Sequence, residues 1–214
     1  MEKNYHSFSR YIIRVKFKHS LIMTKFYYSV LAGIAIGIAA ICNLKSGGII
    51  GAALFAFALS GIVACKWTLF TGKAGFFSNR RELADLLLIL FYNAIGVGLA
   101  VLLSDTLGVL AENATKIVEL RKAAGIRVIL PSILTGLIMT VSVKCAREGQ
   151  WIPLILGIPT FVMCGFPHCV ADIAYYIVAL DFPWEIWLMS VVGNFIGCNL
   201  PTLLRLAKSQ VADK

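Results

Sequence analysis

The stretch CGFPHC, residues 164–169, interrupts an apolar run that extends from about residue 151 to residue 180. That run is too long for one straight membrane-spanning helix, which needs about 20 apolar residues. A second polar interruption, KWTLFTGK at residues 66–73, follows the apolar run at 48–64. Non-helical backbone at membrane depth persists only where it is buried in protein or lines a path, because lipid cannot satisfy its polar groups. The two stretches therefore predict two broken helices at a functional centre.

The rest of the chain has the composition of a membrane protein. Of its 214 residues, 59% are hydrophobic and only 14% are charged, and the mean hydropathy is +0.82. A soluble domain of this size could not hide so much apolar surface. The other apolar runs lie at about 26–43, 83–104, 128–146 and 184–204. We therefore predict an all-α integral membrane protein with six transmembrane helices, of which the second and fifth are broken.

Three weak matches relate the two halves of the chain at a spacing of about 100 residues. The matching segments are Ser29–Gly33 with Ser132–Gly136, residues 69–72 with 166–169, and Tyr92–Gly96 with Gly193–Gly197. Because each copy holds three spans, an odd number, the second copy must enter the membrane from the opposite side. The matches predict two inverted three-helix repeats, at about 26–104 and 127–204.

A basic leader of about 25 residues precedes the first apolar run without a small-residue cleavage site, so we do not expect a signal peptide. Apolar residues on one helical face predict an amphipathic helix at 1–25 in the headgroup region, with a solvated tail as the alternative. The distribution of lysine and arginine predicts a transmembrane domain at 26–206, a tail at 207–214, and both termini in the cytoplasm. The net charge of +9 is then a topology signal, and we expect no nucleic-acid partner.

His168 is the main candidate for the functional centre, because it follows Pro167 in the second break and is the only histidine outside the leader. An ionisable group inside the bilayer is costly and usually functional, and imidazole exchanges protons near neutral pH. A purely structural imidazole bonded to backbone carbonyls is the alternative. Thr71 holds the matching place in the first repeat, where it could bind the same solute or cap a helix. Asp172, four residues after His168, could pair with it on one helical face.

Asn93 and Asn194 each precede a glycine by three residues in the third and sixth spans. Small residues allow helices to approach closely, and an amide can hydrogen-bond a neighbouring broken segment, so we predict that both asparagines are structural supports. The six cysteines lie in or beside apolar runs without zinc-type spacing, so we expect neither a metal nor a cofactor. The spans offer no paired catalytic carboxylates and no activated nucleophile, so the chain is not predicted to be an enzyme.

These residues resemble the formate/nitrite transporter family over about residues 25–206. The resemblance rests on the LFTG loop at 69–72, the GFPH break at 165–168, the paired asparagines and the order of six spans. It implies an aquaporin-like arrangement of helices and a homopentamer in which every protomer holds its own pore. It also implies that Thr71 and His168 are the central pair of that pore.

By the same resemblance, apolar side chains close the path on both sides of the centre. The cytoplasmic constriction corresponds to Leu59, Leu69 and Phe70, and the periplasmic constriction corresponds to Phe55 and Phe161. The family's lysine that makes the periplasmic vestibule positive corresponds to Lys122 or to Arg121. Periodicity alone would be equally consistent with aromatic side chains that only pack or face lipid.

The chain departs from the family's pattern beside the predicted path. Trp67 and Thr68 replace small and acidic residues, Gly136 replaces an asparagine of the fourth span, and Asp172 stands where asparagine is usual. These departures leave the substrate open among formate, nitrite, hydrosulphide and short carboxylates.

The resemblance and the buried histidine predict a channel or secondary transporter for small monovalent anions in the inner membrane of a bacterial or archaeal cell. Carrying a bare charge through an apolar slit is very costly, so proton donation near His168 would let the neutral acid cross. The expected partners are a small anion, a proton, membrane lipid and further copies of the chain. A channel for a small neutral solute such as water, glycerol or ammonia is the alternative function.

Overall fold

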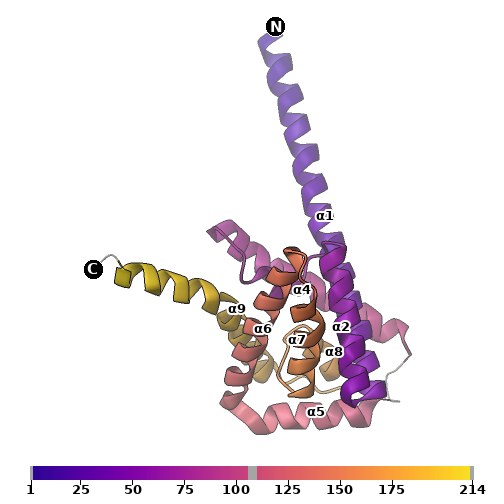
Figure 1. Cartoon of the computed structure of the whole chain (residues 1–214). Coiled ribbons are helices and arrows are strands. Elements are labelled where there is room, and N and C mark those ends of the chain that lie inside the picture. Colours follow the sequence, from indigo (N-terminus) through magenta and orange to yellow (C-terminus); the bar gives the residue numbers. More distant parts are fainter. Residues whose placement is uncertain (1, 106–109, 213–214) are drawn as a thin grey trace.

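The structure, a computed structural model, describes residues 2–105 and 110–212, with side chains described at 23–105 and 110–204. These residues form helices and connecting turns, without a strand among them. In chain order the helices are α1 (Glu2–Ser46), α2 (Gly48–Ala64), α3 (Phe70–Lys73), α4 (Arg80–Leu103), α5 (Ala111–Ala124), the 3-10 helix η1 (Gly125–Val128), α6 (Ile129–Arg147), α7 (Ile152–Met163), α8 (Ala171–Val178) and α9 (Trp184–Ala212) (Figure 1).

The apolar runs of the sequence are all helical. Four helical stretches are long and apolar enough to cross a membrane, namely Met23–Ser46, Arg80–Leu103, Ala111–Arg147 and Trp184–Leu204. The apolar helices α2 and α7 are shorter, because each ends at one of the two predicted interruptions. The all-helical membrane fold is thus confirmed, and helix is broken after both α2 and α7.

The two halves of the chain pack their helices in the same order. α1 packs against α2 and α4, and α6 packs against α7 and α9. The long pairs approach most closely at matched glycines. A Cβ atom added to Gly33 would lie 2.1 Å from the carbonyl oxygen of Asn93, and one added to Gly136 would lie 2.1 Å from that of Asn194. Gly136, which replaces an asparagine of the family's pattern, therefore permits the contact between α6 and α9.

Replacing Gly136 with alanine is expected to destabilise the protein by about 1–3 kcal/mol, the usual cost of overpacking a well-packed interior. The added carbon meets backbone, which cannot rotate away as a side chain can, so α6 and α9 must separate. Thermal unfolding of the purified protein in detergent measures the loss. Gly61→Ala in α2 is the matched control, because a Cβ atom there meets nothing within 4 Å. Equal losses for the two variants would contradict this interpretation of the contact.

α5 lies between the third and fourth predicted spans, where the sequence analysis places only a connection. In Figure 1 it runs across one end of the bundle, roughly perpendicular to the helices above it. Its buried residues Ala114 and Val118 are four positions apart and so share one face of the helix. This helix brings charged residues to the mouth of the site described below.

α1 continues without a break from Glu2, so the predicted boundary at residue 25 is not a helix end. In Figure 1 its N-terminal part projects beyond the bundle along the direction of the first span. The side chains on which the amphipathic face of the leader was predicted lie outside the described side chains. Its placement in the headgroup region therefore stays a prediction, as do the cytoplasmic termini.

Candidate functional site

α2 and α7 end in the same way, which places the two breaks in equivalent conformations. After each helix the chain turns through a residue in the left-handed region, Lys66 with φ of 57° and Gly165 with φ of 65°. The next N–H group, of Trp67 or Phe166, donates to the carbonyl five residues back at 2.9 Å. This is the turn in which glycine is usual, because a Cβ atom is strained there. The first break thus holds a lysine where the second holds glycine.

Asn93 of α4 hydrogen-bonds both α1 and the first break. Its amide nitrogen donates to the carbonyl oxygens of Ser29 and Thr68 at 2.8 and 2.9 Å. Its amide oxygen accepts a hydrogen bond from the N–H of Phe70 at 2.9 Å. A single buried side chain therefore satisfies two backbone groups of the break, those of Thr68 and Phe70, and joins the break to α1.

Asn194 of α9 does the same for the second break. Its amide nitrogen donates to the carbonyl oxygens of Ser132 and Pro167 at 2.8 and 3.0 Å, and its amide oxygen accepts from the N–H of Cys169 at 2.8 Å. Both asparagines are fully buried. The two asparagines bond equivalent backbone groups in the two matched halves of the sequence. This geometry favours their predicted role as structural supports.

Thr71 and His168 meet where the two breaks approach each other. The hydroxyl oxygen of Thr71 lies 3.0 Å from Nε2 of His168, and both residues are buried. The N–H of Ala171 donates to Nδ1 of His168 at 3.2 Å. In a neutral imidazole one nitrogen accepts and the other carries the proton, so Nε2 donates to Thr71. The Thr71 hydroxyl then keeps its own hydrogen for another acceptor, such as a solute beside the pair.

Asp172 does not pair with His168 as the sequence suggests. The spacing of four residues brings side chains together only within a continuous helix, and α8 begins at Ala171, after His168. The carboxylate instead faces Arg121 of α5, with Oδ2 3.4 Å from Nε and Oδ1 3.5 Å from Nη2. Arg121 also donates to the carbonyl oxygen of Gly165 in the second break. The ion pair therefore joins α5 to the second broken helix.

Two cavities lie on either side of the Thr71–His168 pair and share no lining residue. The first, which we call the His168 cavity, has a volume of about 440 Å³ and opens toward α5. His168, Arg121 and Asp172 contribute its polar lining together with Asn43 and Tyr175. Arg121 and Asp172 compensate each other, so their formal charges leave this cavity neutral.

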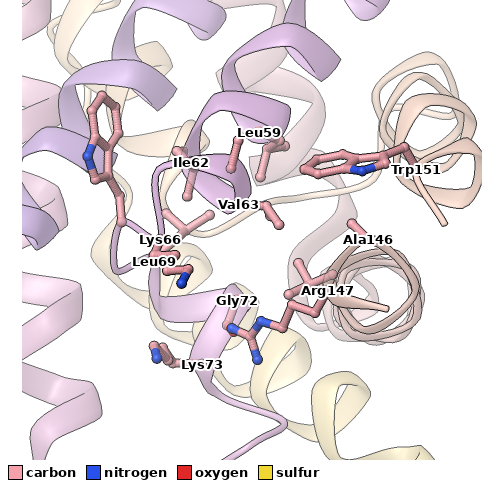
Figure 2. Close-up of a pocket in the computed structure, with 13 residues that line it drawn as sticks. Leu59, Ile62, Val63, Lys66, Leu69, Gly72, Lys73, Ala146, Arg147 and Trp151 are labelled. Atoms are coloured by element: carbon pink, nitrogen blue, oxygen red, sulfur yellow. The ribbon is translucent and has the colours of Figure 1, made fainter. Parts of the chain in front are cut away.

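The second cavity, which we call the Lys66 cavity, has a volume of about 430 Å³ and is lined by the C-terminal ends of α2 and α6 and by the first break (Figure 2). Buried apolar side chains lie between the two cavities. Leu59 and Leu69 line the Lys66 cavity, whereas Phe55 and Phe161 line the His168 cavity. The Phe161 ring stacks on the imidazole of His168, with 5.7 Å between the ring centroids.

Two of the residues predicted for the constrictions and the vestibule line neither cavity. Phe70 is buried but lines neither of them, and its backbone N–H serves the contact with Asn93. Lys122 pairs with Asp181 on the surface and does not line the His168 cavity. Of the two candidates for the vestibule charge, the structure thus places Arg121 at the cavity, with its charge balanced by Asp172.

Three residues contribute to the site without a motif or spacing that predicts their role, namely Trp187, Asn43 and Tyr175. The indole N–H of Trp187 donates to the carbonyl oxygen of Cys169 at 2.8 Å, and Asn43 donates to the Tyr175 hydroxyl at 3.1 Å. These contacts join residues 18 and 132 positions apart. A polar side chain within an apolar run, as at Asn43, is the one signal that could have identified them.

The fold and the site define a multi-pass helical membrane protein in which two broken helices meet at a buried polar pair. Among the residues with described side chains, no group of three His, Cys, Asp or Glu could hold a metal ion. The chain matches no family model and no curated protein.

The chain is similar in structure to a solved chain described as a pentameric formate channel with formate bound. The TM-score is 0.71 at 17% sequence identity, and the match covers 91% of this chain and 99% of that chain. At this identity the likeness is one of fold. The overall helical fold that the resemblance to the formate/nitrite transporter family implies is therefore confirmed, and the aquaporin-like arrangement and the inverted repeats stay predictions.

Proposed function

We propose that the protein is a channel or secondary transporter for small monovalent anions, in which proton donation beside His168 lets the neutral acid cross. The observation that carries the proposal is the buried Thr71–His168 pair, which lies between two cavities at the junction of the broken helices. The Thr71 hydroxyl and the Nε2–H group of His168 are donors that suit an anion. The structural likeness to a formate channel supports the same class of solute.

The apolar layer beside the pair explains why a proton is needed. Phe55, Phe161, Leu59 and Leu69 are buried and offer no hydrogen bond to a charged solute. Moving an ion into such surroundings costs far more than moving a neutral molecule of the same size. An anion that takes up a proton beside His168 crosses the layer as its conjugate acid. Transport therefore accelerates as pH falls.

We further propose that the protein is a homopentamer with one path in each protomer. The formate channel that shares the fold is pentameric. Several helices also carry exposed apolar side chains, among them Phe57, Leu87 and Leu156, which would face lipid or neighbouring copies. We also propose that both termini of the chain lie in the cytoplasm, in accordance with the distribution of lysine and arginine.

Flux assays in liposomes test the proposed function. Liposomes with wild-type protein are expected to take up formate, nitrite, hydrosulphide, acetate or lactate faster at pH 5.5 than at pH 7.5. The anion with the highest rate of uptake identifies the substrate. His168→Ala is expected to lower that uptake about 100-fold, because removing one preorganised donor at a dry centre typically costs 10²–10³ in rate. Thr71→Val, which keeps the shape but removes the hydroxyl, should also lower it.

Ser190→Ala is the matched control, because Ser190 is buried and bonds only within its own helix, to the carbonyl oxygen of Ile186. Its uptake should equal that of the wild type. Anion uptake that is indifferent both to pH and to His168→Ala would contradict the proposal. Uptake of water, glycerol or ammonia without anion uptake would support the channel for neutral solutes instead.

A further inference from the structure

The Lys66 cavity gathers three cations without a carboxylate. Lys66, Lys73 and Arg147 line it, and its lining residues include neither aspartate nor glutamate. Figure 2 shows these three side chains around Leu69 and Gly72. All three residues are exposed, so a ligand that enters the cavity can reach them.

The nearest carboxylates have other partners. Asp85 forms an ion pair with Lys25, and Glu82 accepts hydrogen bonds from the backbone N–H of Ser78 and the amide of Asn79. Both carboxylates line a neighbouring cavity, which Lys73 and Arg147 also line. Among residues 23–105 and 110–204, the three cations of the Lys66 cavity take part in no ion pair. On the side of the Lys66 cavity their charge therefore has no partner within the protein and can attract a ligand.

One cation is held in place before any ligand binds, and a second lies on a strained backbone. The guanidinium of Arg147 donates to the carbonyl oxygen of Gly72 at 3.0 Å and lies 4.5 Å from the centroid of the Phe76 ring. Lys66 occupies a left-handed backbone conformation that the second break fills with Gly165. A strained backbone conformation of this kind is found at functional sites, where the function requires that side chain at that position.

We propose that the Lys66 cavity binds a small multivalent organic anion, with two or three carboxylate or phosphate groups. A monovalent anion would compensate only one of three neighbouring cations, whereas a multivalent one would compensate most of their charge. The volume of about 430 Å³ lies in the range of about 300–1,000 Å³ that is typical of small-molecule sites. Trp67 and Trp151 supply apolar walls for the carbon skeleton of such a ligand.

The bound anion would act as a plug. Leu59 and Leu69 are buried where the cavity meets the constriction, so a ligand of this size and charge cannot pass between them. On the basis of the proposed function, its presence on this side of the membrane lowers the flux of small monovalent anions. Binding of the anion in the Lys66 cavity does not require that the protein transports small anions. Binding and flux can therefore be measured separately.

Calorimetric titration of the full-length protein in nanodiscs of phosphatidylcholine tests the site, with citrate as the probe and formate as the monovalent control. Citrate is expected to bind in competition with salt, and formate to bind at least tenfold more weakly. Lys73→Gln and Arg147→Gln should each weaken citrate binding about tenfold, since the attraction between two charges near a protein surface amounts to a few kcal/mol at most. Lys45→Gln is the matched control, because Lys45 is exposed in the last turn of α1, does not line the Lys66 cavity and should have no effect.

Lys66→Gly separates binding from folding. Glycine removes one charge and also relieves the left-handed backbone, so this variant should bind citrate about tenfold more weakly while its unfolding temperature stays equal or rises. Citrate that does not bind, or that binds the wild type and the three variants equally, would overturn the proposal.

The flux assay distinguishes failure of the site from failure of the proposed function. If citrate binds but no small anion is transported, the site stands and the proposed function fails. If formate flux is high and citrate neither binds nor lowers it, the site fails and the proposed function stands. Inhibition that occurs in the wild type and is lost in Arg147→Gln supports both.

Discussion

Asn194→Leu is expected to lower the free energy of unfolding by about 4 kcal/mol. Leucine has nearly the shape of asparagine, so the packing changes little. The carbonyl oxygens of Ser132 and Pro167 and the N–H of Cys169 all lose their side-chain partner. The carbonyl oxygen of Ser132 lies within α6 and keeps its helical hydrogen bond. The carbonyl oxygen of Pro167 and the N–H of Cys169 are left unsatisfied at about 1–3 kcal/mol each, and lipid offers no replacement. Chemical denaturation of the purified protein in detergent measures the effect.

The same substitution elsewhere on α9 provides the control. Asn199 also donates to two carbonyl oxygens, those of Ala74 and Phe195, but it is only half-buried, so water can replace its bonds in part. Asn199→Leu should therefore cost less than half as much. Asn93→Leu, by contrast, should cost as much as Asn194→Leu. Similar losses for the variants at 194 and 199 would show that the hydrogen bonds to the break are not what stabilises it.

The spans and the breaks could be predicted from the sequence because both depend on local composition. Apolar runs of sufficient length have only one stable conformation in lipid, which is helix. The polar stretches at 66–73 and 164–169 are incompatible with uninterrupted burial, and Pro167 cannot continue a helix hydrogen-bond ladder. The pair of Thr71 and His168 also follows from local signals, since each lies at the matching point of one break.

The Arg121–Asp172 pair could not be predicted, because its two residues are 51 positions apart and meet only in three dimensions. The spacing rule that joined Asp172 to His168 assumes a helix that already includes both residues, and α8 begins three residues too late. The left-handed backbone conformation of Lys66 could not be predicted either. Sequence patterns predict such a turn from glycine, so a lysine at this position does not indicate it.

Arg121→Gln is expected to destabilise the protein by about 3–5 kcal/mol, because it leaves the carboxylate of Asp172 buried without a counter-charge. The side chain of Asp172 is 1% exposed and that of Arg121 is 12% exposed, so water cannot compensate the loss. Lys122→Gln is the matched control on the same helix. Lys122 and its partner Asp181 are both nearly half exposed, and such surface pairs contribute only about 0–1 kcal/mol. Thermal unfolding in detergent compares the two variants.

The double variant Arg121→Gln/Asp172→Asn separates the pair from its individual charges. Replacing both charged groups with amides removes the uncompensated charge, so most of the lost stability should return. If the double variant is as unstable as Arg121→Gln, the bond from Arg121 to the carbonyl oxygen of Gly165 matters more than the ion pair.

The same three variants test whether the neutrality of the His168 cavity matters for transport. Arg121→Gln leaves the cavity with a net negative charge, Asp172→Asn leaves it positive, and the double variant leaves it neutral. Because a local charge changes the concentration of a small anion at the mouth of a path, flux from the α5 side should fall about tenfold in the first and rise in the second. The double variant should match the wild type, and increasing salt should reduce all these differences. Equal flux in all four proteins would show that access through the His168 cavity does not limit transport.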